Sequence, residues 1–160
     1  LGVFNGYSQG SSPIVGYHYG AQNHAEVKNV LKRSLTMLAS AAVVLTAIAI
    51  GGARMLSAVF VGYDAALLDM TTRAFRICAV PFLVMWFNMY TSCFFTALND
   101  GAVSAAISFM RALVLPLICV LVMPAIWHLD GVWFSLVGSE ILGVFVSLYF
   151  LLSKRKKYHY

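Results

Sequence analysis

The stretch GSSPIVGYHYGA, residues 10–21, decides how this chain is interpreted, because it closes an uncharged N-terminal segment and precedes the first charged cluster, residues 26–33. Small residues let helix backbones approach closely in a bilayer, and a proline frees a backbone carbonyl that neighbouring groups must satisfy. The surrounding sequence is mainly Leu, Val, Ile, Ala and Phe. The stretch therefore predicts an interior transmembrane helix that faces a cavity rather than lipid.

The composition indicates an integral membrane protein. Of the 160 residues, 61% are hydrophobic and 11% are charged, whereas soluble domains carry about 25% charged residues. The net charge of +5 is concentrated in clusters between apolar runs, which favours membrane topology over nucleic-acid binding. The chain begins without Met and shows no signal-peptide pattern, so we expect a C-terminal piece of a longer protein.

Uncharged or nearly uncharged runs predict an all-α polytopic fold with about five transmembrane helices, the first one incomplete. A run of 20 residues gives a helix of about 30 Å, the thickness of the hydrocarbon core. Residues 22–33 are polar and helical in pattern, which predicts a short interfacial helix that continues into the next span. The predicted spans are residues 1–22, 34–53, 77–99, 102–126 and 132–152.

Short polar motifs predict where these helices begin and end. Gly51-Gly52 predicts a helix stop, and Asp64 predicts a helix N-cap. Asn99-Asp100-Gly101 and the segment 128–131 predict tight turns. The basic residues at the C-terminus predict a solvated tail over residues 154–160, which leaves 1–153 as the membrane part.

The positive charges predict the orientation in the membrane. If successive connections alternate sides, one side carries seven Lys and Arg residues, in the segment 28–33 and the tail 154–157. The other side carries three, namely Arg54, Arg73 and Arg76. The positive-inside rule therefore places the C-terminus in the cytoplasm of a multi-pass protein of the cell (inner) membrane.

The opening stretch resembles a family signature, Q-P-I-x-G-Y-N-Y-G-A, of the multidrug and toxic compound extrusion (MATE) transporters. Pro13-Ile14, Gly16-Tyr17 and Tyr19-Gly20-Ala21 match it, whereas Ser12 and His18 replace the usual Gln and Asn. Further segments resemble consecutive family landmarks in order and spacing. These segments are 76–83, 94–101, Arg111 with Pro116-Leu117, and 129–133.

The resemblance implies helices eight to twelve of a twelve-helix, two-lobe transporter with a cytoplasmic C-terminus. It further implies a secondary antiporter that exports organic cations in exchange for H⁺ or Na⁺ by alternating access. The implied partners are the lipid bilayer, small organic cations and the missing N-terminal helices. The alternative is a lipid-linked oligosaccharide flippase of the same superfamily, which often lines its cavity with several basic residues; here only Arg111 lies within a predicted span.

Glu140 and Arg111 are the charged residues within predicted spans. Charged groups in a bilayer usually face the protein interior, pair with each other or take up a proton. Glu140 is thus either a carrier of the coupling ion or a countercharge for a cationic substrate, or a structural partner of Arg111. Arg111 fits a structural or gating pair.

Four further residues are candidates for the cavity. Asn88 and Tyr90 lie in the middle of the predicted span 77–99 and offer polar atoms, although Asn88 also fits a structural interhelical hydrogen bond. This span has no carboxylate, which argues against a Na⁺ site of the kind that some family members place there. Tyr17 fits a cation–π contact with a lipophilic cation, and His18 could titrate near neutral pH, although a packing role suits it equally.

Other functions find little support. Cys78, Cys93 and Cys119 fall in apolar segments, without the spacing of a metal site, and fit buried small side chains. Nothing resembles a phosphate-binding loop or a nucleophile triad, so we expect neither an enzyme nor a bound cofactor. The pairs His24 with Glu26 and His128 with Asp130 fit ordinary loop residues better than a membrane transferase.

Overall fold

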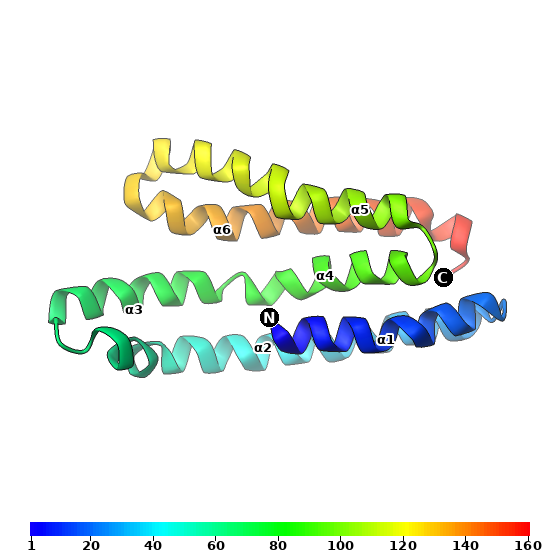
Figure 1. The fold of residues 1–160 in the computed structure, drawn as a ribbon, viewed down its shortest axis with the longest axis horizontal. Coiled ribbons are helices and arrows are strands. Elements are labelled where there is room, and N and C mark those ends of the chain that lie inside the picture. The colour runs from blue at the N-terminus through cyan, green and yellow to red at the C-terminus, as the bar shows by residue number, and fades with distance from the viewer.

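The computed structural model describes residues 1–160, except for the side chain of Leu129. The described backbone forms helices joined by short turns, and no strand occurs in it. The helices lie roughly along one long axis (Figure 1), which confirms the all-α class. Their order is α1 (Gly2–Gly20), α2 (His24–Val61), α3 (Ala65–Ala79), α4 (Phe82–Ala97), α5 (Gly101–Phe109), the π-helix η1 (Met110–Val114) and α6 (Leu115–Tyr158).

The helix boundaries follow from capping residues at three polar turns. The side chain of Asn23 accepts a hydrogen bond from the amide of Glu26, that of Asp64 from Ala66 and Leu67, and that of Asp100 from Val103. These bonds satisfy amides that the first helical turn leaves without partners. The predicted N-cap at Asp64 and the predicted turn at Asn99-Asp100-Gly101 are confirmed.

Helix α2 differs from the prediction at Gly51-Gly52. The helix continues through both glycines and ends at Val61, so the predicted stop there is wrong. A glycine inside a helix costs about 1 kcal/mol relative to alanine. This cost does not end the helix here, because the residues that follow continue the helical backbone hydrogen bonds. The polar segment at its start joins the same helix, as expected, and α2 reaches 38 residues.

Helices α3 and α4 form one rod that bends by 42° at a short break. The break contains Pro81, which lacks a backbone N–H and interrupts the helical ladder. The rod that contains the predicted span 77–99 therefore begins at Ala65. The bend separates the green halves of the rod in Figure 1.

Helix α6 contains the second predicted reversal. The backbone at Trp127 (φ −114°, ψ 15°) and His128 (φ 50°, ψ −128°) is not helical. The chain folds back there, so that Gly101–His128 and Asp130–Tyr158 lie antiparallel (Figure 1).

By length and composition, three helices could cross a membrane: His24–Val61, Gly101–His128 and Asp130–Tyr158. The bent pair α3 and α4 makes a fourth if it counts as one span. Helix α1, which was predicted to be mostly a span, is not among them. It lies against α4, and its residues Phe4, Ser8, Ser11 and Val15 are buried at helical spacing.

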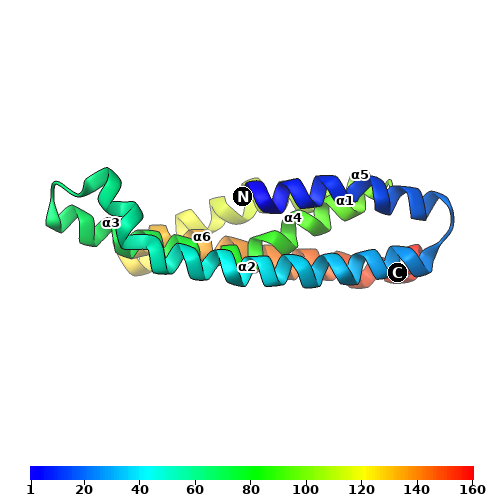
Figure 2. The same ribbon diagram turned by 90° about the horizontal axis from the view of Figure 1, so that it is seen from below.

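The predicted connections lie at opposite ends of the bundle, as expected. At one end, Arg73 of α3 forms an ion pair with Asp130 beside the reversal in α6, with Arg73 Nη2 2.6 Å from Asp130 Oδ2. At the opposite end the start of α2, the α4–α5 turn and the C-terminus come together, and Figure 2 shows the C-terminus beside the first turns of α2.

The C-terminal tail is packed rather than fully solvated. Helix α6 continues to Tyr158, and the side chains of Tyr158 and Tyr160 are buried. The Tyr158 hydroxyl donates a hydrogen bond to Asp100 Oδ2, and the Tyr160 ring lies 5.1 Å from that of Phe94. The basic side chains 155–157 remain exposed. The aromatic residues of the tail therefore belong to the core.

Candidate functional site

Glu140 and Arg111 form an ion pair inside the bundle. Arg111 Nη2 lies 3.0 Å from Glu140 Oε1, and Arg111 Nε lies 3.1 Å from Oε1 and 3.2 Å from Oε2. The two side chains are 26% and 14% exposed, respectively. Several donor contacts to one carboxylate make this a charge-assisted contact with defined geometry.

The π-helix η1 positions Arg111. It occupies Met110–Val114, between α5 and the remainder of the span. Pro116 follows shortly after and lacks the N–H that would bond to the carbonyl of Ala112, so the regular ladder is interrupted here. π-turns of this kind are rare and occur frequently at functional sites.

Asn88 joins the ion pair from α4. Its amide nitrogen donates to Glu140 Oε2 at 2.9 Å and to the Glu140 backbone carbonyl at 3.0 Å. Its amide oxygen accepts from the Ser147 hydroxyl at 2.9 Å. Asn88 is fully buried, so these three bonds satisfy an amide that would otherwise be costly to bury.

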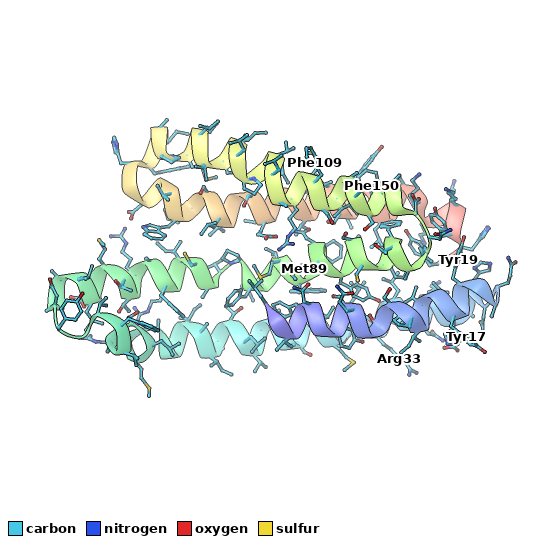
Figure 3. The ribbon with its side chains drawn as sticks, in the orientation of Figure 1. Tyr17, Tyr19, Arg33, Met89, Phe109 and Phe150 are labelled. Atoms are coloured by element: carbon cyan, nitrogen blue, oxygen red, sulfur yellow. The ribbon has the colours of Figure 1, made fainter. Side chains whose placement is uncertain are left out.

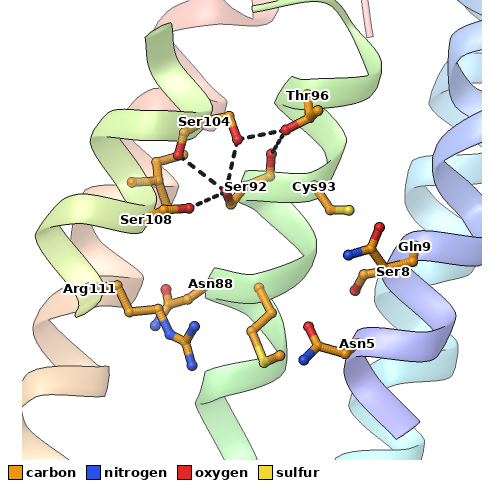
Figure 4. Close-up of a pocket in the computed structure, with 12 residues that line it drawn as sticks. Asn5, Ser8, Gln9, Asn88, Ser92, Cys93, Thr96, Ser104, Ser108 and Arg111 are labelled. Atoms are coloured by element: carbon orange, nitrogen blue, oxygen red, sulfur yellow. Dashed lines mark hydrogen bonds between the residues drawn. The ribbon is translucent and has the colours of Figure 1, made fainter. Parts of the chain in front are cut away.

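A polar cavity of about 390 Å³ lies beside the ion pair. Asn5, Ser8 and Gln9 of α1 form one wall, and residues of α5 and η1 form the opposite wall, with α4 between them (Figure 4). Asn88 and Arg111 line the cavity, but Glu140 does not. The full lining is Asn5, Ser8, Gln9, Asn88, Met89, Ser92, Cys93, Thr96, Ser104, Ile107, Ser108 and Arg111.

Hydrogen bonds between hydroxyl groups connect α4 to α5 at this cavity. Ser92 Oγ lies 3.0 Å from Ser104 Oγ and 2.7 Å from Ser108 Oγ, and Thr96 Oγ1 lies 2.7 Å from Ser104 Oγ (Figure 4). Small hydroxylic residues of this type allow close helix packing and supply interhelical hydrogen bonds in membranes. They also leave oxygen atoms at the cavity wall.

The structure brings together three of the six residues predicted for the site: Glu140, Arg111 and Asn88. Tyr90 is buried on α4, with its ring 6.5 Å from that of Tyr7, and it does not line the cavity. Among the described residues, the Tyr90 hydroxyl has no hydrogen-bond partner.

Tyr17 and His18 lie outside the cavity. Tyr17 is 74% exposed near one end of the bundle (Figure 3), and its ring lies 5.4 Å from that of His18. The opening stretch instead contributes close packing. A Cβ on Gly16 would lie 3.5 Å from the Ala97 carbonyl oxygen of α4.

Sequence reasoning missed the α1 and α5 walls of the cavity. Asn5 and Gln9 are four residues apart in an apolar segment, and Ser104 and Ser108 repeat this spacing. Polar residues at i and i+4 share one helix face, and this signal could have identified both walls.

A metal centre finds no support in the described part of the chain. Within it, no three His, Cys, Asp or Glu residues cluster closely enough to hold a metal ion. The three cysteines are free; Cys119 is buried, as predicted, whereas Cys78 and Cys93 are only partly buried, and Cys93 lines the polar cavity.

Comparison with known proteins identifies the family. The family model described as MatE matches residues 1–122. No curated protein and no solved structure gives a match. The matched region runs from α1, with the opening stretch, through α5 and η1 into the first part of α6, and covers more than half of the chain. The chain therefore belongs to the MatE family of membrane transporters.

Proposed function

We propose that this chain is part of a secondary active antiporter that exports organic cations in exchange for H⁺ or Na⁺, in the cell (inner) membrane and with a cytoplasmic C-terminus. The observation that carries the proposal is the Arg111–Glu140 ion pair beside a polar cavity. Charged residues within membrane spans are expensive and usually mark ion or substrate pathways.

The geometry supports a specific form of coupling. While Glu140 is ionised, its charge neutralises Arg111, and the cavity wall tolerates a cationic substrate. Protonation of Glu140, or binding of Na⁺ to its carboxylate, would release Arg111 and leave a positive charge at the cavity wall. A cation in the cavity would then be repelled, so ion entry and cation exit would be coupled.

The cavity walls offer suitable contacts for such a substrate. Asn5, Gln9 and the hydroxyl groups supply acceptor oxygens, and Met89 supplies an adaptable apolar surface. Alternating access requires a second structural repeat that moves against this one. The missing N-terminal helices of the same protein are the proposed partner for that movement, so transport requires the complete protein.

The alternative function is a lipid-linked oligosaccharide flippase. Arg111 favours it, because a guanidinium in the cavity wall suits a phosphate group. Glu140 opposes it, because its carboxylate contacts that guanidinium at 3.0 Å and competes with phosphate. The ion pair therefore favours cation transport.

The test uses the complete protein in cells that lack other efflux systems. A fluorescent organic cation is followed while the proton or the sodium gradient is collapsed separately, in the wild type, Glu140→Gln and Asp69→Asn. Asp69 is an exposed carboxylate on α3, so its variant controls for loss of one negative charge.

We expect cation accumulation in the wild type and Asp69→Asn to rise when one gradient is collapsed. In Glu140→Gln, accumulation should be high and independent of both gradients, at equal protein levels in the membrane. Gradient-dependent efflux by Glu140→Gln would contradict the coupling role of Glu140. Absence of cation efflux in the wild type, together with movement of a phosphorylated polyprenyl glycan, would favour the flippase.

A further inference from the structure

A groove between the start of α2 and the end of α6 combines an apolar floor with a basic rim. Its volume is about 380 Å³. The rim contains Lys28, Lys32 and Arg155. The remaining lining is almost entirely apolar: Leu31, Leu35, Thr36, Leu151, Leu152 and Tyr160.

The two lysines, Lys28 and Lys32, are not paired with a side-chain carboxylate. Among the side chains that the structure describes, no carboxylate lies within 4.0 Å of them. Glu26, the acidic residue nearest in sequence to the two lysines, accepts a hydrogen bond from Asn29 instead. The Nε of Arg155 donates to the Tyr160 backbone carbonyl at 3.1 Å. This contact holds the Arg155 side chain at the rim of the groove.

The order of the groups along the helices matches that of a phospholipid. Lys28 and Lys32 are one turn apart on the outer part of α2, and Leu35 lies about 4.5 Å further along the axis toward the middle of the span. On α6, Leu151 and Leu152 lie one turn before Arg155 and are therefore also closer to the middle of the span. Cations therefore stand where a head group would lie, and leucines stand where an acyl chain would continue.

Tyr160 closes the floor of the groove. Its side chain is 6% exposed, and its hydroxyl donates to the Leu151 carbonyl at 2.9 Å. The packed tail thus joins α6 to the core without covering Leu152, which remains 60% exposed.

We propose that this groove binds one membrane phospholipid with a net negative head group. The phosphate contacts Lys28, Lys32 and Arg155, and an acyl chain lies along Leu35, Leu151 and Leu152. Basic pockets between transmembrane helices are suited to anionic head groups. The proposal requires only that the chain spans a membrane and does not depend on the transported substrate.

The test measures lipid retention by native mass spectrometry of the complete protein in detergent micelles. The probes are dioleoylphosphatidylglycerol and dioleoylphosphatidylcholine, which share acyl chains and differ in head-group charge. The variants are Lys28→Gln/Lys32→Gln and the charge-matched control Arg33→Gln/Lys156→Gln. Arg33 and Lys156 are exposed on the same end of the bundle but do not line the groove.

We expect the wild type and the control to retain phosphatidylglycerol in preference to phosphatidylcholine. A basic residue near an anionic lipid contributes about a fivefold factor in affinity, so Lys28→Gln/Lys32→Gln should weaken phosphatidylglycerol binding by about tenfold or more. Lys28→Arg/Lys32→Arg should restore it. Unfolding temperatures without added lipid should be equal in all variants, because both lysines are exposed.

Two results would overturn the proposal. One is equal retention of both lipids by the wild type. The other is an equal loss of phosphatidylglycerol binding in the control variant, because it would show that total charge, and not the groove, attracts the lipid.

Discussion

Asn88 and Gly143 fit together across the interface of α4 and α6: a Cβ added to Gly143 would lie 2.7 Å from the amide nitrogen of Asn88. Such a contact is too short for two heavy atoms without a shift. Asn88 cannot move freely, because Glu140 and Ser147 hold its amide through three hydrogen bonds. The missing side chain of Gly143 therefore lets α4 approach α6 closely enough to build the site around Glu140.

Gly143→Ala should destabilise the protein by about 1–3 kcal/mol, the usual cost of forcing extra atoms into a packed interior. The measurement is thermal unfolding of the complete protein in detergent. Gly51→Ala is the control, because a Cβ at Gly51 meets no atom within 4 Å and alanine is the better helix former. Equal unfolding temperatures for Gly143→Ala and the wild type would show that the interface of α4 and α6 has room for a methyl group at Gly143.

Replacing both partners of the Arg111–Glu140 pair should cost less than the sum of the two single replacements. Arg111→Met or Glu140→Met alone leaves a mostly buried charge without its partner, and we expect a loss of about 2–4 kcal/mol for each. The double variant should lose less than the sum, with a coupling of about 1 kcal/mol or more. A double-mutant cycle in the unfolding free energy measures this coupling, and additive losses would show that the two charges are independent.

The pair Arg73–Asp130 should contribute little although its contact is short. The distance is 2.6 Å, but the side chains are 68% and 39% exposed, so water screens the attraction. Arg73→Gln should change the unfolding free energy by less than about 1 kcal/mol. A loss as large as that of Arg111→Met would contradict the view that burial, rather than distance, determines the value of these pairs.

Asp100 should make the docked tail sensitive to acid. The Tyr158 hydroxyl, together with the Val103 amide and nearby Lys157 and Lys154, holds the pKa of Asp100 below its usual range. The pKa of Asp100 is therefore lower in the folded state than in the unfolded state, where it is about 3.9. The ionised Asp100 carboxylate contributes its full stabilisation above the unfolded-state pKa. This stabilisation is lost as the pH falls through the folded-state pKa.

Tyr158→Phe should therefore lower stability by about 1 kcal/mol at pH 7, and its difference from the wild type should shrink below about pH 4. Unfolding temperatures at pH 7 and at pH 3.5 measure this change. Tyr149→Phe is the control, because Tyr149 is 67% exposed and packs edge-on against Phe150. A difference that stays constant with pH would show that Tyr158 acts through packing alone.

The sequence by itself determined the membrane class, the capped starts of several helices and the charged members of the site. Apolar runs, capping residues such as Asp64 and Asp100, and isolated charges such as Glu140 are signals carried within one or two helical turns, so they can be recognised without knowing the fold. The resemblance in residues 10–21 likewise pointed to the family that the match over residues 1–122 establishes.

The tertiary structure decided which distant residues meet. It brought Asn88 to Glu140, placed Asn5 and Gln9 on the cavity wall and Tyr17 outside it, and buried Tyr158 and Tyr160 of the basic tail. These contacts depend on the register and crossing of separate helices, and on the space that Gly143 leaves for Asn88. Local sequence patterns fix the direction of a side chain on its own helix, but only packing against the other helices decides what that side chain touches.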